Sequence, residues 1–343
     1  MTEHDTRMRR EILEIPQAVA RLLHDGRGAI AAAADALQAL DPPFVATVAR
    51  GSSDHVATYL KYVCEILAGL PVASIGPSVA SIYGTPLKLG AAACLSVSQS
   101  GQSPDIVELA RAARAGGALA VAITNHPGSP LGAASDHALD IHAGPELSVA
   151  ATKTFVTSAV AGLLLIAEWR RDKALLAAIE ALPDRLEEAA ALDWPEFRAA
   201  LDGWHSLFVL GRGPGYAMSN EAALKFKETC QVHAESYSSA EFLHGPVSIV
   251  DLGFPLLFLA VGDAAEKGMA EVADNMVETG AAVFITSRFA GRARGLPSVR
   301  TGHALTDPIA LIVSVYAMVE RVAAARGLDP DAPRHLRKVT ETV

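Results

Sequence analysis

Short apolar runs that alternate with helical patterns are the feature that most restricts how this chain can fold. In the first half of the sequence these runs are residues 44–49, 71–75, 91–97 and 118–123. Helical patterns, such as those at residues 77–83 and 103–115, separate them. Strands that alternate with helices form a parallel sheet covered on both faces, and ligands bind beyond the carboxyl ends of its strands. The sequence therefore predicts an α/β fold with a binding site at that edge.

The same layout returns in the second half, after a helical connector at residues 171–200. A predicted strand at residues 205–210 leads into a glycine-rich turn and a helix. Later elements are strand candidates at residues 255–261, 281–285 and Val299, and a closing helix at residues 307–326. This repetition indicates an internal duplication. The glycine-rich turn lacks the GxGxxG spacing of dinucleotide-binding proteins, which argues against that function.

A serine-rich turn joins the apolar run at residues 91–97 to the helical pattern that follows. Unpaired backbone N–H groups and the helix dipole suit such a turn to an anion, and Gly101 lets the backbone approach a ligand closely. Further donors come from the side chains of Ser98, Gln99, Ser100 and Ser103. The turn has neither a lysine nor Walker spacing, so it suits a single phosphate rather than a nucleoside triphosphate. The alternative is an ordinary turn in which Ser103 caps the helix.

A second turn of this kind, Arg50-Gly51-Ser52-Ser53, follows the apolar run at residues 44–49. In a parallel sheet both serine turns reach the same carboxyl edge, and this favours phosphate binding over an incidental serine-rich loop. The turn Val261-Gly262-Asp263-Ala264 of the second half carries an acid and no serine cluster. We therefore expect the second half to have lost phosphate binding.

Composition narrows the class of protein further. The formal net charge of -9 argues against a broad surface for nucleic acid. Cys64, Cys94 and Cys230 have no paired spacing, which indicates buried free thiols in a reducing compartment. The N-terminus has no apolar signal segment, and the apolar helix predicted at residues 149–169 contains charged residues, as a core helix does. We expect a cytoplasmic protein that binds neither nucleic acid nor membranes.

The second half also contains candidates for acid–base chemistry. Glu221, Lys225 and Glu228 recur at helical spacing and share one face, either as a base with its electrostatic partner or as a solvated Glu–Lys pair. His244 precedes Gly-Pro on a rigid turn and can transfer protons near neutral pH, although a lone loop histidine is often only exposed. Lys338 lies in a basic stretch near the C-terminus, and such a stretch is ordinarily a frayed tail.

Several ordered motifs together resemble the SIS (sugar isomerase) domain family, over about residues 8–343. The motifs are Arg50-Gly51-Ser52-Ser53 and residues 98–103, 149–153, 221–228, 233–237, 244–246 and 333–338. The likeness is greatest to the isomerase half of glucosamine-6-phosphate synthase and to the stand-alone deaminases and deglycases related to it. It implies two tandem SIS domains, each a parallel sheet flanked by helices in a three-layer α/β/α, flavodoxin-like arrangement.

The resemblance implies five segments in a fixed order. They are an N-terminal helical segment at residues 1–25, a first SIS domain at 26–170, a helical connector at 171–200, a second SIS domain at 201–327 and a C-terminal catalytic tail at 328–343. The first SIS domain is expected to bind the phosphosugar.

The resemblance also implies roles for individual residues. Glu228 corresponds to the base that moves a proton between C1 and C2 of the sugar, and Lys225 supports the site. His244 corresponds to a ring-opening residue supplied by a neighbouring subunit, and Lys338 to a lysine that forms a Schiff base with the open-chain sugar. The substrate-binding positions are Ser52, Ser53, Ser98, Gln99, Ser100, Ser103, Val149 and Ala151. No metal or cofactor is expected.

These roles predict an aldose–ketose isomerase and amino-sugar-phosphate deaminase that acts on a hexose or hexosamine 6-phosphate as a homodimer. The expected reaction converts glucosamine 6-phosphate and water to fructose 6-phosphate and ammonia. Alternatives are a fructosamine-6-phosphate deglycase, a galactosamine-6-phosphate deaminase, and a sugar-phosphate sensor without catalysis. Thr2 stands where the synthase glutaminase domain has its nucleophilic cysteine, and Ala151 where the synthase has serine, so glutamine-dependent synthesis is not expected.

Overall fold

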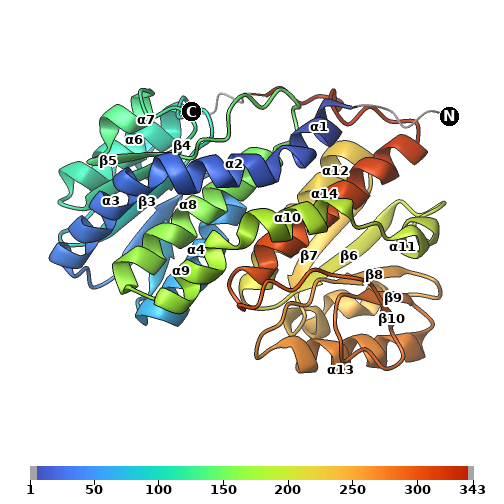
Figure 1. Ribbon diagram of the computed structural model, residues 1–343. Coiled ribbons are helices and arrows are strands. Elements are labelled where there is room, and N and C mark those ends of the chain that lie inside the picture. The colour runs from blue at the N-terminus through green and yellow to red at the C-terminus, as the bar shows by residue number, and fades with distance from the viewer. Residues whose placement is uncertain (1–5, 339–343) are drawn as a thin grey trace. The chain divides into compact units, whose positions relative to one another are not determined.

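The computed structural model describes residues 6–338, which form two compact units, each built around its own parallel sheet (Figure 1). The first unit comprises Ile15–Glu146, Lys153–Glu180 and, at the end of the described chain, residues 337–338. The second unit comprises residues 6–14, Leu147–Thr152 and Ala181–Leu336. Each unit therefore combines segments that are far apart in the sequence.

The first unit has a sheet of five parallel strands in the order β2-β1-β3-β4-β5. The strands are β1 (Val45–Val48), β2 (Val72–Ser74), β3 (Ala93–Val97), β4 (Leu119–Thr124) and β5 (His137–Asp140). Every residue of the central strand β3 is buried, as expected when helices cover both faces of a sheet. The four predicted strands are confirmed. The edge strand β5 was not predicted, because His137 and Asp140 interrupt its apolar residues.

Helices cover both faces of this sheet. Helices α3, α4 and α8 pack together on one face, and α5, α6 and α7 pack together on the other. The helices of this unit are α2 (Ile15–Arg21), η1 (Leu22–Gly26), α3 (Arg27–Leu40), α4 (Ser52–Ala68), α5 (Ser78–Ser81), α6 (Pro104–Ala115), α7 (Pro130–Ala134), α8 (Lys153–Arg170) and α9 (Lys173–Glu180). Between the sheet and α6 lies a core that includes Ala46, Cys94 and Ile106.

The second unit repeats this architecture. Its sheet has the order β10-β9-β8-β6-β7, which from the opposite edge matches the first sheet strand for strand. The strands are β6 (Ser206–Gly211), β7 (His233–Ser238), β8 (Pro255–Phe258), β9 (Ala282–Ile285) and β10 (Arg294–Gly295). The helices are α1 (Arg7–Leu13), α10 (Leu182–Ala191), α11 (Pro195–Ala200), α12 (Pro214–Cys230), η2 (Glu241–His244), η3 (Pro246–Ile249), α13 (Glu266–Met276), η4 (Val277–Thr279) and α14 (Asp307–Ala325). The predicted tandem α/β fold is confirmed.

The duplication extends to backbone torsions at the first strand–helix turn of each unit. Gly51 precedes α4 with φ 56° and ψ −134°, and Gly213 precedes α12 with φ 54° and ψ −136°. A positive φ of this kind is accessible to glycine at little cost. Arg50 and Arg212 precede the two glycines, whereas serines follow only the first of them. The two turns therefore share a backbone conformation but present different side chains.

Two of the predicted boundaries are wrong. Val299 is not in a strand, because the edge strand β10 is the short, exposed pair Arg294–Gly295, which has no apolar pattern to reveal it. The helix predicted from Val149 begins only at Lys153. The preceding segment is held in bends, where the backbone N–H groups of Leu147 and Ser148 donate to the Glu11 carboxylate instead of entering a helix.

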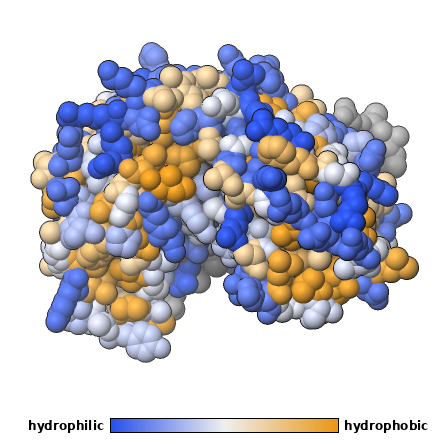
Figure 2. Space-filling view, turned by 90° about the horizontal axis from the view of Figure 1, so that it is seen from below, coloured by the Kyte–Doolittle hydropathy of each residue, from blue (hydrophilic) through white to orange (hydrophobic). Residues whose placement is uncertain are grey.

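Helix α14 is the one helix within residues 6–338 that is long and apolar enough to cross a membrane. Most of its surface is buried in the second unit, against α10 and α12. Burial of this kind is typical of the core helix of a globular domain. Figure 2 shows one face of the molecule, on which hydrophilic and apolar side chains are intermixed.

Candidate functional site

The two serine turns of the first unit lie at the same edge of its sheet. Strands β1 and β3 are parallel neighbours, with Val48 opposite Ser96, so the turns that follow them emerge side by side. The guanidinium of Arg50 from the first turn donates two hydrogen bonds, of 3.0 and 2.9 Å, to the buried Asp105 carboxylate at the start of α6. The predicted meeting of the serine turns is therefore confirmed, and an ion pair joins them.

Hydrogen bonds within the second turn arrange its donors around the start of α6. Ser98 Oγ accepts from the Gly101 N–H (3.2 Å), and Ser100 Oγ accepts from the Gln102 N–H (3.3 Å). Ser103 occupies the N-cap position of α6, yet its side chain makes no capping hydrogen bond. Ser103 is therefore the N-cap residue, as the alternative predicted, but its hydroxyl makes no capping hydrogen bond to the helix.

Gly101 is the residue that permits this turn. Its φ is +62°, and a Cβ added to it would overlap Ser129 Oγ and lie 2.7 Å from Ser129 Cβ. A real Cβ does not approach other atoms so closely, so any side chain would displace the turn or Ser129. Ser129 in turn caps α7, where its side chain accepts from the Gly132 N–H.

Gly101→Ala is expected to destabilise the first unit by about 1–2 kcal/mol through its positive φ and by about 1–3 kcal/mol more through the steric overlap. It should also weaken phosphate binding by displacing the donors. Gly84→Ala is the matched control, because Gly84 has φ +57° and a Cβ added to it would have nothing within 4 Å. Urea unfolding of both variants tests this, and equal losses for the two would contradict it.

Lys338 is fixed within the first unit and does not behave as part of a frayed tail. Its Nζ lies 2.7 Å from Glu146 Oε2, and the Glu146 side chain is fully buried. Glu146 also accepts hydrogen bonds from the Thr154 N–H (3.0 Å) and from Thr154 Oγ1 (2.7 Å), at the start of α8. Burial alone raises the pKa of Glu146, but Lys338 and Thr154 together lower it below its ordinary value.

Glu146 is a site residue that local sequence patterns do not reveal. Its only local signal is an acid placed after Gly144-Pro145 and shortly before a helix, a pattern that surface loops share. Its partner Lys338 follows 192 residues later, so no local periodicity connects the two.

Ionised Glu146 is expected to stabilise the folded chain at neutral pH and to lose this effect in acid. The pKa of the folded state lies below the ordinary value of 4.5, so the stabilisation is complete above pH 4.5 and disappears as the pH falls through the folded-state pKa. Glu146→Gln should lower the free energy of unfolding by about 1–3 kcal/mol at neutral pH and by less near about pH 3. Urea unfolding at both pH values measures the difference. Glu108→Gln, on the surface of α6, is the control, and a pH-independent cost for Glu146→Gln would refute the expectation.

Glu221, Lys225 and Glu228 of α12 form an ion-paired cluster in the second unit. Lys225 Nζ lies 3.3 Å from Glu221 Oε1 and 2.5 Å from Glu228 Oε2. Tyr316 of α14 donates a further hydrogen bond to Glu221 Oε1 (3.1 Å). The predicted shared face is confirmed, but the alternative of a solvated Glu–Lys pair is wrong, because the side chains of Glu221 and Lys225 are fully buried.

Electrostatics keep Lys225 charged. Burial opposes the charge on Lys225, but attraction to Glu221 and Glu228 raises its pKa overall. The ammonium therefore persists at neutral pH and holds the Glu228 carboxylate in place. The side chain of Glu228 is 19% exposed, so it combines a buried cationic partner with access to a ligand.

The other predicted site residues lie on loops or at helix ends. In the first unit, Ser52 is the first residue of α4 and Ser53 the second, both half-buried. In the second unit, Val149 and Ala151 lie in the irregular segment before α8, and exposed His244 ends η2. The structure thus brings the serines and Lys338 into one unit, and Glu228, Lys225, His244, Val149 and Ala151 into the other.

Comparison with known proteins identifies the family. The SIS domain model matches residues 44–168 and 200–287. A glutamine--fructose-6-phosphate aminotransferase [isomerizing] of Symbiobacterium thermophilum is 34% identical over 316 residues, which cover 86% of this chain and 51% of that protein. The chain therefore spans about half the length of this curated relative. It belongs to the SIS domain family, whose members in these comparisons include phosphosugar isomerases.

Solved structures agree with this assignment. A protein of Silicibacter pomeroyi DSS-3 assigned as a phosphosugar isomerase is 63% identical, with a TM-score of 0.93 over 95% of this chain and all of that one. The C-terminal domain of glucosamine-fructose-6-phosphate aminotransferase from Francisella tularensis shares the fold, with 24% identity, a TM-score of 0.80 and coverage of 96% of this chain and 99% of that one.

Proposed function

We propose that this protein is a phosphosugar aldose–ketose isomerase that releases ammonia from glucosamine 6-phosphate, giving fructose 6-phosphate. The observation that carries the proposal is the 2.5 Å ion pair between buried Lys225 and partly exposed Glu228. A carbon-bound proton next to a carbonyl or imine is only weakly acidic, so its removal needs a carboxylate that is ionised and fixed in position. This ion pair meets both conditions.

The serine turns bind the phosphate in this proposal. Hydroxyls of Ser53, Ser98, Ser100 and Ser103, together with Ser52 and Gln99, donate to it beside the start of α6. The positive end of the helix dipole adds to this attraction. Because the phosphate is remote from the reacting carbons, binding it converts a loose encounter into a fixed geometry. Backbone and side-chain groups of Val149 and Ala151 contact the sugar.

Proton transfer by Glu228 then isomerises the open-chain sugar, once His244 has opened the ring. Glu228 removes the proton from C2 of the aldehyde form and O1 takes up a proton from solvent, giving an enaminol. Glu228 returns its proton to C1 and the nitrogen releases one to solvent, so that C2 becomes an imine and C1 a hydroxymethyl group. Lys225 stabilises the carboxylate before the proton is taken up.

Lys338 completes the reaction through nucleophilic catalysis. Its ammonium first loses a proton to solvent, since the lowered pKa of Glu146 makes that carboxylate, 2.7 Å away, a poor proton acceptor. The free amine adds to the C2 imine and expels ammonia, leaving a Schiff base between Lys338 and C2. Water hydrolyses this Schiff base to fructose 6-phosphate and the free lysine, so one water is consumed for each ammonia released.

Assembly and location follow from the same proposal. His244 acts on the site of a neighbouring subunit, so the active form is a homodimer in the cytoplasm. Sedimentation of the active enzyme tests this part, and full activity as a monomer would exclude it.

Two other substrates fit the same chemistry. A fructosamine 6-phosphate or galactosamine 6-phosphate also presents a phosphate remote from an amine-bearing carbon. A sensor that binds sugar phosphate without catalysis is less well supported, because such a protein has no use for a buried cation that orients Glu228.

Ammonia release by the purified protein tests the proposal. Glucosamine 6-phosphate, galactosamine 6-phosphate and a fructosamine 6-phosphate are supplied separately, and the ammonia or amine released and the sugar phosphate formed from each are quantified. We expect the highest turnover with glucosamine 6-phosphate and equimolar products. Binding of all three without turnover of any would favour the sensor.

A further inference from the structure

A polar cavity of about 450 Å³ lies within the second unit, beyond the ends of β8 and β9 and beside the start of α14. Its lining includes Glu266, Ser287, Arg288, Ser298, Arg300 and His303. This volume falls in the range of about 300–1,000 Å³ that is typical of small-molecule sites. None of these residues takes part in the function proposed above.

Internal duplication places this cavity at the counterpart of the serine turns. In the first unit Thr124, the last residue of β4, donates through Oγ1 to Gln99 O (3.3 Å). In the second unit Thr286, directly after β9, donates through Oγ1 to Ala260 O (2.8 Å). Each acceptor lies two residues after the end of its strand, Gln99 after β3 and Ala260 after β8. Gln99 therefore corresponds to Ala260, and Gly101 corresponds to Gly262. The serine hydroxyls of the first turn have no equivalent here, in agreement with the sequence.

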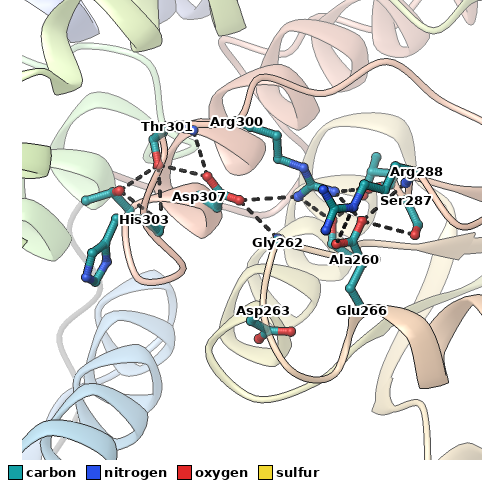
Figure 3. A network of polar contacts seen from close by, with 12 residues as sticks. Ala260, Gly262, Asp263, Glu266, Ser287, Arg288, Arg300, Thr301, His303 and Asp307 are labelled. Carbon is teal, nitrogen blue, oxygen red and sulfur yellow. Dashed lines mark hydrogen bonds and ion pairs between the residues drawn. The ribbon is translucent and has the colours of Figure 1, made fainter.

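Arginine side chains occupy the place of those hydroxyls. Arg300 Nη2 donates to Glu266 Oε1 and to Thr286 O, each at 2.9 Å, and Arg300 Nη1 lies 3.4 Å from Asp307 Oδ2. Figure 3 shows Arg300 reaching across to Glu266, with Arg288 beside it. Glu266 and Asp307 are almost fully buried, so the Arg300 guanidinium is held in one orientation.

Protein donors engage both oxygens of Asp307 and Oε1 of Glu266. Glu266 accepts from Arg300, from Ser287 Oγ (3.1 Å) and from the Arg288 N–H (3.2 Å). Asp307 accepts from the Gly262 N–H (3.0 Å), and from Thr301 through both N–H (2.7 Å) and Oγ1 (2.8 Å). The Arg300 guanidinium is engaged as well, because its Nη1 also donates to Ala260 O (3.3 Å). Spare donor capacity lies with Arg288. The Arg288 side chain is 78% exposed, and its Nε is 3.9 Å from Glu266.

We propose that this cavity binds a phosphate monoester, with the phosphoryl group on the exposed guanidinium of Arg288, beside Arg300, and the ester body extending toward His303. The forked guanidinium of arginine matches phosphate oxygens well. Figure 3 shows Arg288 and His303 at opposite ends of the network, so a ligand that reaches both is longer than inorganic phosphate. The second unit has thus replaced neutral donors with cationic ones at the same edge of the sheet, and our expectation that it lost phosphate binding is replaced by this proposal.

Calorimetric titration of the full chain with glucose 6-phosphate tests the proposal. A Ser98→Ala/Ser103→Ala background weakens binding at the serine turns, so that heat from the second unit is measured alone. In that background we expect one equivalent to bind, and adding Arg288→Ala should weaken binding about tenfold or more. Arg292→Ala is the matched control, because Arg292 is a half-exposed arginine of the same unit that pairs with Glu278 outside the cavity.

Three outcomes would overturn the proposal. These are no binding in the serine-deficient background, equal losses for Arg288→Ala and Arg292→Ala, and affinity for inorganic phosphate equal to that for glucose 6-phosphate. Thermal unfolding checks that Arg288→Ala folds normally, as its exposure leads us to expect. The experiment measures binding and not turnover. Its result therefore tests this proposal independently of the proposed reaction.

Discussion

Replacement of Glu228 by glutamine is expected to reduce turnover of glucosamine 6-phosphate by about 10²–10⁴-fold, the effect of removing a general base. The amide keeps the shape of the side chain but cannot accept the carbon-bound proton. Binding of the sugar phosphate should be retained, because the serine turns that are proposed to hold the phosphate belong to the other unit. The loss should therefore fall on kcat, with KM nearly unchanged.

The fold tolerates this change, because Lys225 keeps Glu221 as a partner at 3.3 Å after Glu228 is neutralised. Exchange of the C2 proton with solvent deuterium provides a second readout, which reports proton removal itself and should be lost with turnover. Glu271→Gln, an exposed position on α13, is the control and should behave as wild type. Turnover above a tenth of wild type in Glu228→Gln would remove this carboxylate from the proposed mechanism.

Reduction with borohydride during turnover is expected to attach the sugar phosphate covalently to Lys338, and Lys338→Arg should abolish both the adduct and the release of ammonia. Borohydride reduces a Schiff base to a stable amine, so the adduct marks the lysine that forms the imine. Arginine preserves the positive charge opposite Glu146, and therefore the ion pair, but cannot form an imine.

Peptide mapping of the reduced protein identifies the modified lysine. Buried Lys225 and Lys153 should carry no sugar, since their ammonium groups are engaged with Glu228 and with Pro145 O, respectively. Lys61→Arg, at a half-exposed position of α4, is the matched control and should leave the adduct intact. An adduct on any lysine other than Lys338, or full turnover by Lys338→Arg, would contradict the proposed Schiff base.

Local patterns in the sequence were sufficient for most of the fold. The central strands are continuous apolar runs, because both of their faces are buried, and so they are visible without any knowledge of their partners. The edge strands β5, β7 and β10 have a single neighbour and carry polar residues such as His137, His233 and Arg294. Nothing in a short window distinguishes them from loops.

Residue order alone was enough to specify the repeated α/β architecture, the position of the serine turns at a strand edge, and the common helical face of Glu221, Lys225 and Glu228. Each depends on spacings of a few residues, which the backbone translates directly into geometry. Folding of the whole chain was needed to bury this face, to join Lys338 to Glu146, and to bring Arg300 to Glu266 and Asp307. Most of these contacts pair segments that are distant in the sequence, and their strength depends on burial, which the packing of a complete unit creates.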